Sequence, residues 1–371
     1  MDFSSFGKGG TELVLDCSSS DLKVVQGSYN PKTGKIVIDK SGIVPLEGDS
    51  ISDGAISDSF GIVMALKHAF AKLDIRAKSV TLTTEGAFLH SRDLELPVVK
   101  EDQLKDMVKY EVMGQGSNRD LSIDYIVYGT TQDEETNADK LKVRATAVPV
   151  EVIADFRELL KQLDLAPDAM DVNPNAIRKL FASTIINGNH STAQSTLMLL
   201  ELSTKTTTVT ILDKGFPVLS RRLQFGHQNI RQVADSVRKL QGGEVGQSSL
   251  ARRLNISKSD NDSSVPIEDI DVWNETVAEQ PALQSAVNAY FKSLVDAVSR
   301  TAQFSISKFR IDAISTCFIY GSGSGYKKID KELSRQLGTQ VEILNTLSNV
   351  EGRNFELPQF VNCCGALIRE D

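Results

Sequence analysis

The sequence is poor in the residues that mark several large protein classes. Its four cysteines show no CxxC spacing and no nearby histidine, so we expect buried free thiols and no zinc site. The formal net charge is −8 without a long basic run, which argues against a nucleic-acid-binding surface. No apolar stretch approaches the ~20 residues that span a bilayer, and the polar start from Met1 to Gly10 does not resemble a secretory signal. We therefore expect a cytoplasmic protein that reaches a membrane only through a partner.

Three short turns of small polar residues are the most informative feature of the chain. They lie at Asp16–Lys23, Glu201–Thr206 and Gly321–Gly325, and each follows an apolar run typical of a strand. A turn of this kind at a strand end presents backbone N–H groups and hydroxyls to an anion. We therefore predict that the three turns meet in a cleft between two halves of the molecule and hold a nucleotide there.

The strand pattern of the first half returns in the second half. Alternation and turn signals over residues 12–40 predict three successive strands, with a helix from Ile62 and another strand at 79–83 behind them. Residues 196–223 repeat the order of strand, polar turn, strand, turn and strand. Duplication of one unit explains this echo, and two unrelated hairpins explain it equally well.

A compact unit interrupts the first half at residues 88–149. Its pattern predicts a strand, an amphipathic helix at 99–113 and two further strands around the acidic loop Asp133–Glu135. We expect this loop to be a solvated hairpin tip and not a metal site. Later in the chain, a long helix is predicted at 282–308 and an apolar helix at 357–368.

Taken in order, these elements resemble the actin-like ATPase superfamily, and most closely the type IV pilus assembly protein PilM family, over nearly the whole chain. The segments that carry the resemblance are Asp16–Lys23, Arg92–Pro97, Asp124–Gly129, Met170–Val172 and Phe225–Gly226. The resemblance implies an α/β fold, namely an actin-like (ribonuclease H-like) duplicated two-lobed fold with a small α+β inserted subdomain.

The resemblance also implies boundaries for four subdomains. They are 11–87, 150–195 and 356–371 for the first lobe (1A), 88–149 for the insert (1C), 196–228 and 301–355 for the second lobe (2A), and 229–300 for subdomain 2B.

Carried over position by position, the family pattern implies a site for ATP or ADP with Mg²⁺. Asp16 and Glu201 would hold the metal through water. The residues expected at the nucleotide are Asp16, Ser18, Ser19, Ser20, Lys23, Glu201, Ser203 and Thr204 at the phosphates and Gly321, Ser322, Gly323 and Ser324 at the adenosine.

Several residues of this chain depart from the family pattern. Ser18 and Ser203 stand where the family has glycine, and Asp21 places a negative charge inside the first turn. No residue is identified as a catalytic base, because His227 is better explained by a structural role. We therefore expect a nucleotide binder with weak or no ATPase activity.

The function implied by the resemblance is a cytoplasmic scaffold of the type IV pilus inner-membrane platform. It would bind the cytoplasmic N-terminal peptide of PilN, a membrane protein, in a groove between the first lobe and the insert, and could also contact pilus motor ATPases or itself. The helix residues expected at the peptide are Met107, Val108, Tyr110 and Val112. The alternative for this apolar face is packing on the insert's own sheet.

Three other functions remain open from the sequence. An active ATPase or kinase of the superfamily would need intact glycine turns and a usable base. A type II secretion platform protein would share the fold. A polymerising protein resembling FtsA would carry an amphipathic membrane-binding tail, whereas this sequence ends Arg369-Glu370-Asp371.

Overall fold

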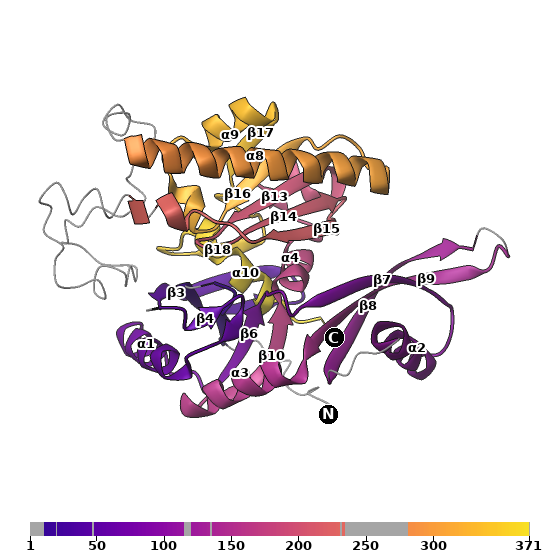
Figure 1. The fold of residues 1–371 in the computed structure, drawn as a ribbon. Coiled ribbons are helices and arrows are strands. Elements are labelled where there is room, and N and C mark those ends of the chain that lie inside the picture. The colour runs from indigo at the N-terminus through magenta and orange to yellow at the C-terminus, as the bar shows by residue number, and fades with distance from the viewer. Residues whose placement is uncertain are drawn as a thin grey trace, which may run out of the picture.

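Figure 1 shows two stacked lobes and a smaller sheet that projects from one side of them. The computed structural model describes residues 11–19, 21–46, 48–114, 120–133, 136–230, 232–233 and 281–370. Each lobe has its own sheet covered by helices on both faces. This is the layered α/β architecture that the sequence predicts.

The sheet of the first lobe combines an antiparallel meander with two parallel strands. In sheet order its strands are β10 (Ala166–Val172), β6 (Ser79–Thr84), β1 (Glu12–Asp16), β2 (Asp21–Asn30), β3 (Lys35–Pro45) and β18 (Val350–Gly352). Because β1 is covered on both faces, its side chains from Leu13 to Asp16 are all buried. Helices α1 (Ser59–Lys72) and α3 (Val150–Gln162) cover one face of this sheet.

The sheet of the second lobe has the same design. In sheet order its strands are β15 (Phe216–Leu223), β14 (Thr207–Asp213), β13 (Thr196–Leu202), β16 (Thr316–Tyr320) and β17 (Gln340–Ile343). Helices α8 (Pro281–Phe309) and α9 (Ile329–Leu337) cover its outer face, and α8 runs across the top of Figure 1.

The two sheets share one topology. The order β3-β2-β1-β6-β10 in the first lobe matches β15-β14-β13-β16-β17 in the second, with the antiparallel and parallel pairings in the same places. Duplication of one unit, and not two unrelated hairpins, accounts for this match.

Two short helices, α4 (Asn173–Phe181) and α10 (Leu357–Leu367), pack against each other between the two sheets. Their close approach depends on Gly365, because a Cβ added there would lie 2.2 Å from the carbonyl oxygen of Ala176. The inner faces of both sheets pack on this helix pair, which therefore joins the lobes through one apolar core.

The insert forms its own three-stranded sheet with one helix. In sheet order its strands are β7 (His90–Pro97), β9 (Asp139–Pro149) and β8 (Leu121–Gln132), and helix α2 (Glu101–Met113) packs on one face. The predicted order of strand, helix, strand and strand is confirmed. Asp133 lies at the hairpin tip, as expected, where it forms an ion pair with Lys140.

Short elements connect these parts. They are β4 (Ile51–Ser52), β5 (Ala55–Ile56), β11 (Ile185–Ile186), β12 (His190–Ser191) and the 3-10 turns Thr192–Gln194 and Ser322–Gly325.

Some details differ from the expectations. Strand β18 (350–352) pairs with β3 of the first lobe, although it falls within the range 301–355 assigned to the second. Strand β10 was not expected, because it contains Pro167 and its polar residues, Asp168 and Asp171, do not alternate with apolar ones. Residues 234–280, most of the predicted 2B subdomain, lie outside the described residues. Within the described part of the chain, no helix combines the length and apolar character needed to cross a bilayer.

Candidate functional site

The ends of the two equivalent strands β1 and β13 meet where the lobes face each other. β1 ends at Asp16, and Glu201 is the next-to-last residue of β13. The amide nitrogen of Asn362, from α10, donates to Asp16 Oδ2 at 3.3 Å and to Glu201 Oε1 at 3.1 Å. All three side chains are buried. The predicted convergence of the first two turns is therefore observed.

The two turns hold their carboxylates in the same way. Ser18 donates to Asp16 Oδ1 from its backbone nitrogen at 3.0 Å and from its hydroxyl at 2.5 Å. Ser203 donates from its hydroxyl to Glu201 Oε1 at 3.3 Å. Each serine thus fixes the carboxylate two residues before it. Glycine, which the resemblance implies at these two positions, could not make the hydroxyl contacts.

Lys23 is the cation next to this pair of carboxylates. It stands opposite Asp16 in the β1–β2 register, and its ammonium lies 3.3 Å from Asp16 Oδ2 and 3.5 Å from Ser19 Oγ. Burial disfavours the charged form, but the charges of Asp16 and then Glu201 outweigh it and raise the pKa of Lys23. Lys23 is therefore a buried, permanently charged ammonium.

The third turn reaches the same place through Tyr320, whose hydroxyl lies 3.5 Å from Glu201 Oε2. Gly321 follows with φ of +86°, and a Cβ there would lie 2.8 Å from the carbonyl oxygen of Leu202. A side chain is thus excluded by backbone conformation and by close packing. Of the other predicted residues, Ser324 hydroxyl donates to Gly321 O at 2.7 Å, and Ser322 and Gly323 lie beside His227.

Ser19 and Thr204, from the first two turns, both contact Asp21. Ser19 donates its hydroxyl to the carbonyl of Asp21 at 2.8 Å, and Thr204 reaches across to the Asp21 carboxylate at 3.4 Å. Asp21 was expected to repel a nucleotide from within its own turn, and here it also accepts a bond from the opposite lobe. Ser20 lies outside the described residues.

His227 contacts the second turn through its backbone nitrogen, which donates to the carbonyl of Ser203 at 3.4 Å, and the third turn through its ring. Its ring nitrogens lie 2.9 Å from Ser322 Oγ and 3.0 Å from Tyr326 OH, and its side chain is buried. Both ring nitrogens of His227 thus contact hydroxyl groups within the protein.

Glu85 is a third buried carboxyl group where the lobes meet, and it was not among the residues predicted from the sequence. It directly follows β6, and its Oε2 lies 3.5 Å from the hydroxyl of Thr208 in the opposite lobe. Burial, followed by the charges of Glu201 and Asp16, raises the pKa of Glu85 to about 8. The available signal was weak: Glu85 directly follows a predicted strand, as the three turns do, but β6 is rich in threonine.

Asn362 was also missed. A polar side chain in the otherwise apolar segment 357–368 is a signal of a buried polar contact. Its Oδ1 is buried and has no hydrogen-bond partner in the described part of the structure.

The charges of this cleft fit a hydrated divalent cation. Asp16, Glu85 and Glu201 carry three carboxyl groups, and among the described residues Lys23 is the ammonium paired with them. Burial, set against the opposing effect of Lys23, raises the pKa of Glu201, so ionising the whole group is costly. No set of three histidine, cysteine or acidic side chains within the described ranges could hold a metal directly. Contact through water is the mode that suits this geometry.

Several side chains form contacts between the two lobes. Besides the contact of Thr204 with Asp21, Lys205 forms an ion pair with Asp49, and Arg222 forms one with Asp53. Burial lowers the pKa of Arg222 to about 10, which is still well above neutrality. Three side-chain contacts therefore join the two lobes beside the buried carboxyl groups.

The helix residues expected at a peptide turn out to be divided between core and surface. Val108 is 1% exposed and packs on the insert's own sheet, with Met107 and Val112 partly buried beside it. Tyr110 is 77% exposed. Val108 therefore offers no surface to a peptide in this structure. The alternative weighed from the sequence, packing on the insert's own sheet, holds for that residue.

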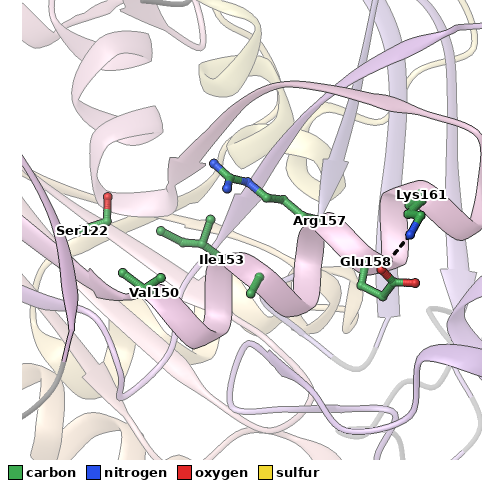
Figure 2. Close-up of a pocket in the computed structure, with 7 residues that line it drawn as sticks. Ser122, Val150, Ile153, Arg157, Glu158 and Lys161 are labelled. Carbon is green, nitrogen blue, oxygen red and sulfur yellow. Dashed lines mark ion pairs between the residues drawn. The ribbon is translucent and has the colours of Figure 1, made fainter. Parts of the chain in front are cut away.

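A groove between the insert and the first lobe lies elsewhere, along α3 and the start of β8. Figure 2 shows its lining, which comprises Ser122, Val150, Ile153, Ala154, Arg157, Glu158 and Lys161. Val150 is 40% exposed, and Glu158 pairs with Lys161 at 3.7 Å. These residues recur at helical spacing on the side of α3 away from Phe156 and Leu160. That second stripe of α3 is the signal that could have identified them.

Two sheets of one topology, packed around a crossed helix pair with carboxylates at the ends of equivalent strands, define an actin-like α/β protein. A family model described as type IV pilus assembly protein PilM matches residues 14–259. The chain belongs to the family of type IV pilus assembly proteins PilM.

Three solved structures that match the chain are the following. The PilM-PilN type IV pilus biogenesis complex matches with a TM-score of 0.69 and 17% identity over 97% of this chain and 98% of that chain. The ethanolamine utilization protein EutJ from Carboxydothermus hydrogenoformans gives 0.49 and 9% over 97% and 90%. MreB 5 of Spiroplasma citri, solved with AMPPNP bound, gives 0.43 and 12% over 96% and 95%. The first of these confirms the fold class.

Proposed function

We propose that this protein is a scaffold of the type IV pilus inner-membrane platform that binds the cytoplasmic N-terminal peptide of a PilN-like membrane protein and a nucleotide. The observation that carries this proposal is the groove between α3 and β8, at the boundary of first lobe and insert. Family membership and the solved PilM-PilN complex support it.

The groove has the chemistry of a site for an extended apolar peptide. Val150, Ile153 and Ala154 supply an apolar floor, and Arg157 extends over it as a cation (Figure 2). β8 is an edge strand of the insert's sheet, so its backbone could pair with an added strand. Tyr110 of α2 is a further exposed aromatic on the insert. Met107, Val108 and Val112 would then support the sheet from behind.

The cleft would hold ATP or ADP with Mg²⁺. Asp16 and Glu201 would bind the hydrated metal, and Lys23 would face the phosphates together with the turns at Ser18–Ser20 and Ser203–Thr204. The turn from Gly321 to Ser324 would lie at the adenosine. A bound Mg²⁺ would neutralise the negative charge that the buried carboxyl groups place between the lobes.

Weak or absent hydrolysis fits the state of the cleft. A general base must be unprotonated to accept a proton from water. Glu85 is a carboxyl group of this region that could be considered as a base. With a pKa of about 8, however, it retains its proton at neutral pH. The nucleotide would therefore serve mainly to set the distance between the lobes.

The remaining parts of the proposal concern location and assembly. The protein would lie in the cytoplasm at the inner membrane, held there by its membrane partner. Contacts with pilus motor ATPases and self-association would follow from a platform role.

The test is calorimetric titration of the intact protein with a synthetic peptide of the partner's cytoplasmic N-terminus. Ile153→Glu places a charge in the groove and should weaken binding at least tenfold. Met64→Glu is the matched control, because Met64 is 56% exposed on α1, away from the groove. If the unaltered protein binds no peptide, or if both variants bind equally well, the groove assignment is wrong.

A further inference from the structure

The insert touches the second lobe as well as the first, through a cluster centred on Arg144 of β9. The Arg144 guanidinium forms a two-bond ion pair with Asp93 of β7, at 2.7 Å and 3.0 Å. Its remaining nitrogen donates to the carbonyl oxygen of Pro217, in β15 of the second lobe, at 2.6 Å. One side chain therefore binds two subdomains at once.

Two aromatic rings complete this contact. Tyr128 of β8 and Phe216 of β15 stack with ring centroids 4.5 Å apart and planes at 19°. The Arg144 guanidinium carbon lies 4.8 Å from the Phe216 ring centre and 5.6 Å from that of Tyr128. A paired guanidinium that also contacts aromatic rings is held more firmly than an exposed ion pair. We call Arg144, Asp93, Tyr128, Phe216 and Pro217 the joint.

The second-lobe side of the joint is itself fixed. Phe216 follows the turn Lys214–Gly215, where Gly215 has φ of +82° and a Cβ would lie 2.2 Å from the carbonyl oxygen of Ala182. This turn therefore packs tightly on the end of α4, between the lobes. The joint is anchored on a rigid part of the second lobe and not on a loose loop.

The insert is connected directly to α3, the helix that lines the groove. β9 ends at Pro149 and α3 begins at Val150, without an intervening residue. The backbone nitrogen of Val150 donates to the carbonyl of Asp120 at 2.9 Å, next to Ser122 of β8. Figure 2 shows Ser122 and Val150 together at one end of the groove. Rotation of the insert about this point would widen or narrow the groove.

The geometry points to a mechanical linkage: the joint makes the insert follow the second lobe, so that opening the nucleotide cleft changes the groove between α3 and β8. The inference rests on the proposed function, because it concerns how the two proposed sites affect each other. Arg144 acts here as a positioning residue that touches neither ligand. Since coupling between two sites is reciprocal, peptide in the groove would change nucleotide affinity by the same factor.

The experiment measures peptide affinity by calorimetry, with and without Mg²⁺ and AMPPNP, in the unaltered protein and in two variants. Arg144→Ala removes the ion pair and the ring contacts from the insert, and Phe216→Ala removes the ring from the second lobe. We expect the nucleotide to change peptide affinity at least fivefold in the unaltered protein, and less than twofold in either variant, with both ligands still bound.

Arg92→Ala is the matched control. Arg92 lies in the same sheet and donates to the carbonyl of Glu111 at 2.8 Å, so this contact stays within the insert. It should keep the full coupling. Equal coupling in all four proteins, or no effect of nucleotide on peptide binding in the unaltered protein, would overturn the linkage while leaving the proposed function intact.

A second measurement needs neither ligand. The four native cysteines are buried, so spin labels can be placed at Thr130→Cys in the insert and Arg221→Cys in the second lobe, both exposed positions. We expect the distance distribution between the labels to broaden when Arg144→Ala is added. If no peptide binds, the proposed function fails. The label distances do not depend on that result. If Arg144→Ala leaves the distribution unchanged, the joint does not hold the insert.

Discussion

Asn362 donates from a single amide nitrogen to carboxylates of both lobes, Asp16 in β1 and Glu201 in β13. The helix that carries it, α10, lies between the two sheets and packs on α4. Asn362 thus connects the apolar core that the lobes share with the buried carboxylates at the ends of β1 and β13. Because one amide nitrogen contacts both carboxylates, oxygens of Asp16 and Glu201 lie close enough to share a single donor.

The first prediction concerns this link. Asn362→Ala leaves two buried carboxylate oxygens with fewer donors, and we expect the free energy of unfolding to fall by about 1–3 kcal/mol. Asn362→Asp should cost more, because it adds a fourth carboxyl group to the cluster, and Mg²⁺ should restore part of that loss. Urea denaturation with and without Mg²⁺ measures both effects. Equal stability of the alanine variant would show that the link is dispensable.

The second prediction concerns pH. Burial raises the pKa of Glu85 from its ordinary value of 4.5 to about 8 in the folded protein, so the folded state binds the extra proton between these pH values. Stability should therefore fall as pH rises from about 5 to above 8. Glu85→Gln cannot ionise, and we expect it to be more stable than the unaltered protein at pH 9 by about 4 kcal/mol, and similar to it at pH 5.

Thermal denaturation across this pH range tests the claim. The exposed Glu151 provides the control, since Glu151→Gln should leave the pH dependence unchanged. A Glu85→Gln protein that loses stability with pH as steeply as the unaltered one would show that another group is responsible.

Much of the fold was accessible from the sequence because its signals are local. Strand alternation, turn residues and helical spacing depend on neighbours in the chain. They revealed the repeated strand order of residues 12–40 and 196–223, but only the matching sheet topologies decided between duplication and two unrelated hairpins. Contacts between distant residues left weaker traces. Glu85 and Asn362 looked like ordinary polar residues beside apolar segments, and only folding brings them to Thr208 and to the two carboxylates.

The peptide-binding residues show the same limit from the other side. The apolar stripe of α2 was clear in the sequence, but periodicity does not tell whether such a face meets its own sheet or a partner. Folding places Val108 in the insert's core. In α3 a second stripe lies away from the core stripe, but the sequence does not tell that β8 lies beside it and completes a groove.

The third prediction concerns the approach of the two central helices. Gly365→Ala would place a Cβ 2.2 Å from the carbonyl oxygen of Ala176, so α4 and α10 would have to move apart. We expect a loss of stability of about 2 kcal/mol or more. Gly129→Ala is the control, because nothing lies within 4 Å of its Cβ. Urea denaturation of both variants should separate them clearly, and equal midpoints would contradict the close packing.

The last prediction concerns the contacts that join the two lobes. The ion pair of Arg222 with Asp53 joins the lobes beside Glu85, since Asp53 Oδ2 also accepts a bond from the backbone nitrogen of Ala87 at 2.9 Å. Removing the guanidinium with Arg222→Ala should let the lobes separate more often. Stopped-flow measurements with a fluorescent ATP analogue and Mg²⁺ should then show faster association, by about fivefold or more. The neighbouring Arg221 is exposed, so Arg221→Ala removes the same charge without the interlobe contact and should leave the rate within twofold. Equal acceleration in both variants would assign the effect to net charge, and no acceleration in either would mean that this ion pair does not limit entry to the cleft.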